Sequence, residues 1–157
     1  MALKPDRQAI EYDIKRGCTT VAERGVIAVF STSGSGAAIG LTAGFVQIAA
    51  NPSGTVPAGV LLNDVVNIDE TRYHRNFYKD EIKVNEPVAL LKKGYVTTNM
   101  VTGTPTVGQT AYVSASGYVT PTVSATGGLA ATPKVGQFTS IKDEAGYVTL
   151  EVNLPIV

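Results

Sequence analysis

The tetrapeptide Gly-Tyr-Val-Thr occurs three times in this chain and constrains the fold more than any other sequence feature. The copies begin at Gly94, Gly117 and Gly146. Glycine adopts positive φ without steric cost, and the Tyr-Val-Thr that follows consists of aromatic and β-branched residues that suit a pleated strand. Each copy is therefore predicted to be the turn exit and second strand of a β-hairpin.

The residues before the three copies favour repeated hairpin architecture. The runs PVALLKK, QTAYVSAS and QFTSIKDEA each have the composition of an incoming strand. Hairpins draw on few residue types, so chance could repeat one tetrapeptide, but Val-Gly-Gln also recurs, at residues 107–109 and 135–137. The unequal spacing, and a first half that lacks the pattern, argue against a solenoid.

Alternation of apolar and polar residues predicts strands at both ends of the chain. Ile10, Tyr12 and Ile14 alternate with charged residues, and Val148 to Leu154 alternate with polar ones. Few windows show a helical period, although residues 69–84 are compatible with either a helix or a strand. We therefore predict a mainly β protein, a small β-barrel or β-sandwich built from hairpins with an extended N-terminal arm. Residues 1–24 form the arm and first strand, and residues 25–157 form a single β domain.

Composition limits the classes of partner. The 157 residues include 13 basic and 13 acidic side chains, so the formal net charge is zero and we expect neither nucleic-acid nor membrane binding. The charged start MALKPDRQAIEYD is unlike a secretory signal. A single cysteine, Cys18, excludes an internal disulfide and is compatible with folding in a reducing cytoplasm.

Charge is also unevenly distributed. No Asp, Glu, Lys or Arg occurs from Gly25 to Asn63 or from Gly94 to Pro133. Both tracts carry aromatic and β-branched residues at strand-like spacing, so we interpret them as β structure with small-residue loops. Because a surface short of charge is poorly suited to staying alone in solution, we expect another protein to cover part of it.

Few residues suggest catalysis or cofactor binding. The glycines of STSGSGAAIG follow a GxGxxxG spacing, which differs from the GxGxxG of a dinucleotide-binding turn. His74 is the single histidine and is interpreted as a surface or interface residue, and Cys18 as a small half-buried side chain. The carboxylates between Asp64 and Glu86 lack the spacing of a calcium loop. We therefore predict no enzyme activity, no cofactor and no metal site.

The order of motifs in the second half resembles a known class of viral proteins. ANPSGTVPAGVLLNDVV is followed by KDEIKVNEPVALLKKGYV, VGQTAYVSASGYVT and PKVGQFTSIKDEAGYVTLEVNLP. This succession, over roughly residues 45 to 155, is similar to the head decoration, or capsid cement, proteins of tailed bacteriophages. The resemblance implies no catalytic residue.

The resemblance implies a structural protein of the virion. Such a protein is made in the host cytoplasm and binds the capsid exterior after expansion, usually as a homotrimer at local three-fold positions. Its partners are copies of itself and the major capsid protein. A phage fibre, spike or carbohydrate-binding β module is the alternative, although the chain has no Trp for a sugar platform. An unrecognised enzyme is the third possibility.

Two segments are predicted to contact the capsid or a sister subunit. One is the arm, residues 2–16, whose apolar edge we expect to add as a strand to another chain. The other is the charged and aromatic stretch from Asp69 to Glu86. The predicted interface residues are Ile10, Tyr12, Ile14, Arg72, Tyr73, His74, Arg75, Phe77 and Tyr78.

Overall fold

Strands dominate the part of the chain that the computed structural model describes, residues 2–32, 44–67, 81–123 and 132–155. These ranges contain eleven β-strands and one 3₁₀ turn, η1 (Ala115–Gly117), and no α-helix. The mainly β class predicted from the sequence is confirmed. No described segment is a helix with the length and apolar character needed to span a lipid bilayer.

The first structural unit is a closed five-stranded barrel. Neighbouring strands pair around a complete ring, and the first and last strands of that ring also pair with each other. Around the ring the strands are β1 (Gln8–Cys18), β3 (Gly44–Gln47), β2 (Ile27–Phe30), β4 (Pro57–Leu61) and β7 (Pro87–Thr98). Of the two architectures predicted from the sequence, a β-barrel or a β-sandwich, the β-barrel is therefore correct.

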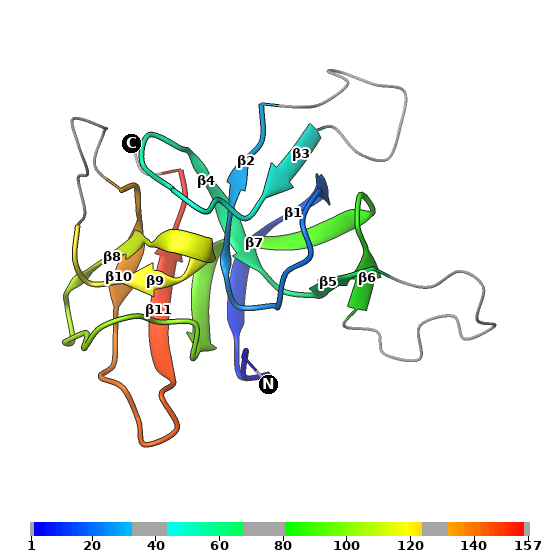
Figure 1. Cartoon of the computed structure of the whole chain (residues 1–157). Coiled ribbons are helices and arrows are strands. Elements are labelled where there is room, and N and C mark those ends of the chain that lie inside the picture. Colours follow the sequence, from blue (N-terminus) through cyan, green and yellow to red (C-terminus); the bar gives the residue numbers. More distant parts are fainter. Residues whose placement is uncertain (1, 33–43, 68–80, 124–131, 156–157) are drawn as a thin grey trace.

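A second ring of strands shares β7 with the barrel. From β7 the sheet continues through four further strands, and an isolated bridge between Val101 and Val119 leads back to the chain that follows β7. In spatial order these strands are β11 (Val148–Asn153), β10 (Lys134–Phe138), β8 (Thr110–Val113) and β9 (Val119–Thr120). Figure 1 shows them gathered on one side of β7, opposite the short parallel pair β5 (Asp64–Val66) and β6 (Glu81–Lys83).

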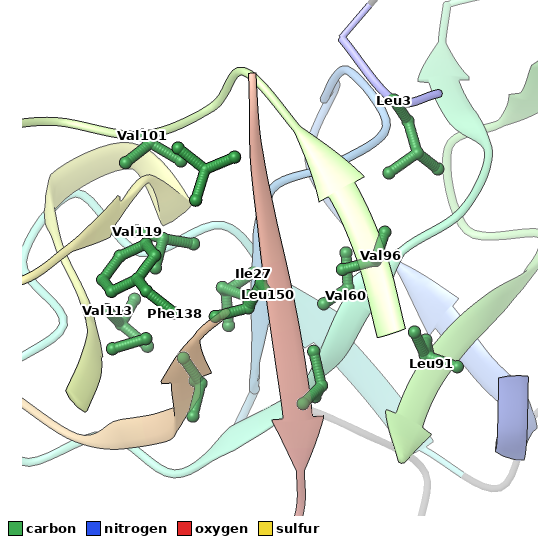
Figure 2. Packing of buried hydrophobic residues seen from close by; sticks show 14 of the residues in the cluster. Leu3, Ile27, Val60, Leu91, Val96, Val101, Val113, Val119, Phe138 and Leu150 are labelled. Carbon is green, nitrogen blue, oxygen red and sulfur yellow. The ribbon is translucent and has the colours of Figure 1, made fainter. Parts of the chain in front are cut away.

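β7 contributes to two hydrophobic clusters, one inside the barrel and one that combines residues of the second ring with residues of the barrel strands β2 and β4. Leu90 packs inside the barrel with Cys18 and Val46, whereas the adjacent Leu91 packs on the other side with Leu150 and Val60. This division follows from the pleat, because successive strand residues point to opposite faces. Figure 2 shows the second cluster, in which residues of β2, β4, β7 and β11 meet.

Two of the three Gly-Tyr-Val-Thr copies occupy the predicted hairpin position. Gly117 and Gly146 lie in turns at positive φ, and the strands that follow, β9 and β11, pair with β8 and β10. The first copy is different, because Gly94 lies inside the continuous strand β7. The prediction of a turn there is wrong, since PVALLKK and GYVT form one strand.

Gly94 is required by close packing between strands. At this residue β7 has a partner on each side, Ala9 of β1 and Val152 of β11. Its φ is 138°, and a Cβ there would collide with the main-chain oxygen of Gln8. The same tetrapeptide thus serves a turn in two places and a crowded strand crossing in the third.

The two Val-Gly-Gln units lie beside each other in space. The Gln137 side chain donates to the Gly108 carbonyl over 2.6 Å, and the Gly108 amide donates to the Phe138 carbonyl over 2.8 Å. A Cβ on Gly136 would collide with the main-chain oxygen of Glu151. The repeated triplet therefore marks two neighbouring segments of the second ring.

The N-terminal segment is extended, and it is fixed to its own chain. Ala2 and Leu3 are buried, and the Lys4 amide donates to the Thr97 carbonyl over 2.9 Å. β1 then pairs antiparallel with β7 from Gln8 to Gly17. One edge of β1 is therefore paired within the chain, and the expected addition of this arm to the capsid or to a sister subunit stays a prediction.

Much of the charge-free sequence belongs to the core. In the described parts of the two tracts, residues such as Ile27, Ala28, Val60, Val96 and Val113 are fully buried. Burial within the chain explains the absence of charge at these positions.

Candidate interaction surfaces

Two of the residues weighed for catalysis or metal binding, Cys18 and Asp64, have hydrogen-bond partners within the described part of the chain. Cys18 is fully buried, and its Sγ donates to the Thr20 carbonyl over 3.3 Å, so the thiol is part of the barrel interior. Asp64 accepts a hydrogen bond of 2.7 Å from the Arg24 amide. Within the described ranges, no three His, Cys, Asp or Glu side chains gather where they could hold a metal ion. His74 and the three glycines of the GxGxxxG motif lie outside these ranges.

A charged contact joins the N-terminus to the hairpin between β10 and β11. Lys4 Nζ lies 3.3 Å from Asp143 Oδ2 and 4.4 Å from the centre of the Tyr147 ring. The Tyr147 amide donates to Asp143 Oδ1 over 2.7 Å. This main-chain hydrogen bond, helped by Lys4, lowers the pKa of Asp143 below its usual value. The contact is exposed and fastens two distant parts of the chain.

An apolar groove of about 400 Å³ lies between the two rings. Phe30 and Val56 come from the barrel side, while Pro133, Leu154 and Pro155 come from the second ring. Lys92 and Lys134 supply positive charge at its wall. The sequence does not reveal this groove, because its walls come from residues far apart in the chain. The groove is thus lined mainly by apolar side chains, with two lysines among them.

The clearest exposed apolar feature is on β1. Ile10, Tyr12 and Ile14 are 71%, 51% and 64% exposed. Since they alternate along one strand, they lie on the same face, and we call these three residues the β1 ridge. The predicted alternation is correct, but the apolar face of the strand points to solvent.

The polar face of β1 turns toward the protein, where its carboxylates form ion pairs. Glu11 lies 3.6 Å from Lys92 and 3.7 Å from Lys93, both on β7. Asp13, opposite Leu90 in the ladder, lies 3.3 Å from Arg16. Turning the strand over would bury the apolar side chains but separate Glu11 from the two lysines of β7. Three shifts of register between β1 and β7 accompany this arrangement.

Six of the predicted interface residues follow one another closely between β5 and β6. Arg72, Tyr73, His74, Arg75, Phe77 and Tyr78 lie outside the described residues. The described strands β5 and β6 precede and follow that stretch and pair in parallel, with Val65 opposite Ile82. The structure thus brings together three of the nine predicted residues.

Comparison with known proteins identifies the family. A family model described as XM1 gp53 minor capsid protein matches residues 11–152, which include strands of both rings and two of the three ridge residues. The chain belongs to this family. Membership of a phage minor capsid protein family indicates a structural, non-enzymatic role in the capsid and therefore a place in the virion. No curated protein matches the chain.

Family membership confirms the broader part of the sequence-based hypothesis. The resemblance to capsid cement proteins correctly indicated a bacteriophage capsid protein. It favours the viral structural class over an enzyme or a carbohydrate-binding module. In this minor capsid protein, the β1 ridge and the inter-ring groove are the described surfaces with the chemistry of protein contacts.

Proposed function

We propose that this minor capsid protein is a decoration protein. It binds the outside of the expanded shell at local three-fold positions and holds neighbouring major capsid protein subunits together. The observation that carries the proposal is the β1 ridge: a member of a capsid protein family leaves three large apolar side chains exposed on one strand. Exposed apolar residues grouped in this way mark a surface that another protein covers.

The stabilising effect follows from linkage. A protein that binds the assembled shell, and not the dissociated subunits, shifts the equilibrium toward the shell. Each contact can be weak, because a particle-bound oligomer must break all of its contacts together before it leaves. Two fused β rings with separate cores suit such a role.

We further propose that the protein acts as a homotrimer. Closed cyclic symmetry is the usual way for like subunits to bury exposed apolar surface, and a three-fold axis matches the proposed position on the shell. Away from the ridge, Val56 at the groove and Val107 before β8 are also exposed, at 61% and 65%, and are available for contacts between subunits.

Reconstitution on particles tests the proposed function. Expanded and unexpanded particles that lack this protein are incubated with the purified chain, then examined by cryo-microscopy and heated to disruption. We expect density at local three-fold sites on expanded particles only, together with a higher disruption temperature. Density inside the shell, or at the portal or tail, would contradict the proposal. Light scattering of the free protein tests the trimer, and a monomeric mass at micromolar concentration counts against it.

A further inference from the structure

We propose that β1 is the acceptor for an extended apolar segment of another capsid protein, which lies along the β1 ridge. This inference rests on the proposed function and adds the chemistry of the partner. It reverses the roles expected from the sequence, in which the N-terminal arm was the strand that inserts elsewhere. In the structure one edge of β1 pairs with β7 of the same chain, so the opposite edge is the one that another protein can reach.

The geometry of β1 suits strand addition. One edge of the strand is paired with β7, and the opposite edge meets β3 only from Arg16 to Cys18. In the described part of the chain, no other strand pairs with this outer edge between Gln8 and Lys15. An incoming segment could therefore form main-chain hydrogen bonds with the edge while its alternate side chains contact the ridge.

The size of the ridge argues that its partner is held on an assembled shell. Three side chains exposed by 51% to 71% present roughly a few hundred Å² at most, whereas a stable pair of proteins buries roughly 800 Å² on each partner. A second copy bound through this surface alone would dissociate in solution. On a shell, many such contacts act together.

Charge also argues against a second copy as the occupant. The antiparallel register that brings all three ridge residues of two copies together is centred on Tyr12. That register places Glu11 of each copy opposite Asp13 of the other, and like charges directly opposite each other destabilise a strand pair. The segment that fits carries aliphatic or aromatic residues at alternate positions and neutral or basic residues between them.

The first test replaces the ridge residues by serine. We compare Ile10→Ser, Tyr12→Ser and Ile14→Ser, singly and together, with Ile141→Ser as the matched control, since Ile141 is exposed to the same 64% as Ile14. The measured quantity is the apparent Kd for expanded particles that lack the protein, with circular dichroism to verify folding. Each ridge variant should bind about tenfold more weakly and the triple variant more weakly still, while the control binds like wild type.

A second test identifies the occupant. A photoreactive phenylalanine analogue at position 12, or at position 141 as the control, is irradiated on decorated particles, and the cross-linked products are weighed by mass spectrometry. We expect a product with another capsid protein from position 12. A product that joins two copies of this chain would overturn the inference.

The outcomes separate this inference from the proposed function. If wild type and the triple variant bind particles equally well, the ridge is not the contact and only the inference fails. If wild-type protein does not bind expanded particles, the proposed function fails and the inference falls with it.

Discussion

Strands β1 and β11 flank β7 in the same antiparallel manner, yet they bury opposite kinds of residue. Both alternate apolar and polar side chains along their length. In β11 the apolar residues Val148, Leu150 and Val152 are each only 1% exposed. In β1 the apolar residues are the exposed ones, and the carboxylates Glu11 and Asp13 turn toward cations of the same chain.

The difference shows what an alternating pattern can and cannot reveal. A period of two identifies a strand with one apolar face, but the direction of that face depends on what lies on each side. β11 has the second hydrophobic cluster beneath it, whereas β1 is held at the barrel by ion pairs and by its ladder with β7. An apolar face left outside is a candidate surface for contact with another protein.

The largest expected effect comes from matched truncations in the two strands. Leu150→Ala removes buried methyl groups from the second cluster and should lower the free energy of unfolding by about 3 kcal/mol. Ile14→Ala removes exposed atoms and should change it by less than about 0.5 kcal/mol. Urea titration at neutral pH measures both. Equal losses would show that the ridge is buried in the free protein and would remove the contrast.

The shared glycine of β7 gives the next largest effect. Gly94→Ala places a Cβ against the Gln8 carbonyl in the crowded strand crossing, at a φ of 138°. We expect a loss of about 2 kcal/mol, from backbone strain together with displacement of β1. Gly146→Ala is the control, because its φ is also positive but no atom lies within 4 Å of the added Cβ. The control should lose only about 1 kcal/mol, and a larger loss there would contradict the packing explanation.

The ion pairs beneath the ridge should contribute less. Glu11 is partly exposed and interacts with two lysines at 3.6 and 3.7 Å, so Glu11→Gln should reduce the free energy of unfolding by about 0.5 kcal/mol or less. The loss should shrink as salt is added, since mobile ions screen the wild-type pairs. A loss that does not depend on salt would indicate a packing role for this side chain.

The smallest effect concerns the contact beside β11. The hydrogen bond from the Tyr147 amide, aided by Lys4, lowers the pKa of Asp143 below its usual 3.8. Its stabilising contribution is therefore fully present above that usual value and is lost as the pH falls through the lowered one. As the pH is lowered from about 5 to about 2, the Tm of thermal unfolding should fall less steeply in Asp143→Asn than in wild type. Parallel profiles would show that the contact does not depend on the carboxylate charge.

The repeated motifs predicted two hairpins correctly but did not predict the role of Gly94 in the shared strand β7. Gly117 and Gly146 were recognisable because a turn glycine followed by β-branched residues is a local signal. Gly94 has the same neighbours in sequence, but its role arises from β1 and β11 approaching β7 from both sides. No local pattern records such an approach, so the sequence could not distinguish the three copies.

The candidate surface was likewise only partly predictable. The β1 ridge was found because its residues are close in sequence and alternate. The groove between the rings was not, since Phe30 and Pro133 are brought together only by the shared strand. The predicted aromatic and basic residues from Arg72 to Tyr78 lie outside the described ranges and stay a prediction.

By itself, the sequence determined the mainly β class, two of the three repeated hairpins and the strand that carries the ridge, because turn glycines and side-chain alternation act over a few residues. Only the tertiary structure decided that two rings share β7, that the N-terminus is held by Thr97 and Thr98 of its own chain, and that β1 turns its apolar face outward. These features depend on contacts between residues far apart in the chain. Their energies are set by which cations, carbonyls and apolar side chains meet across the strands, and a linear pattern does not contain that information.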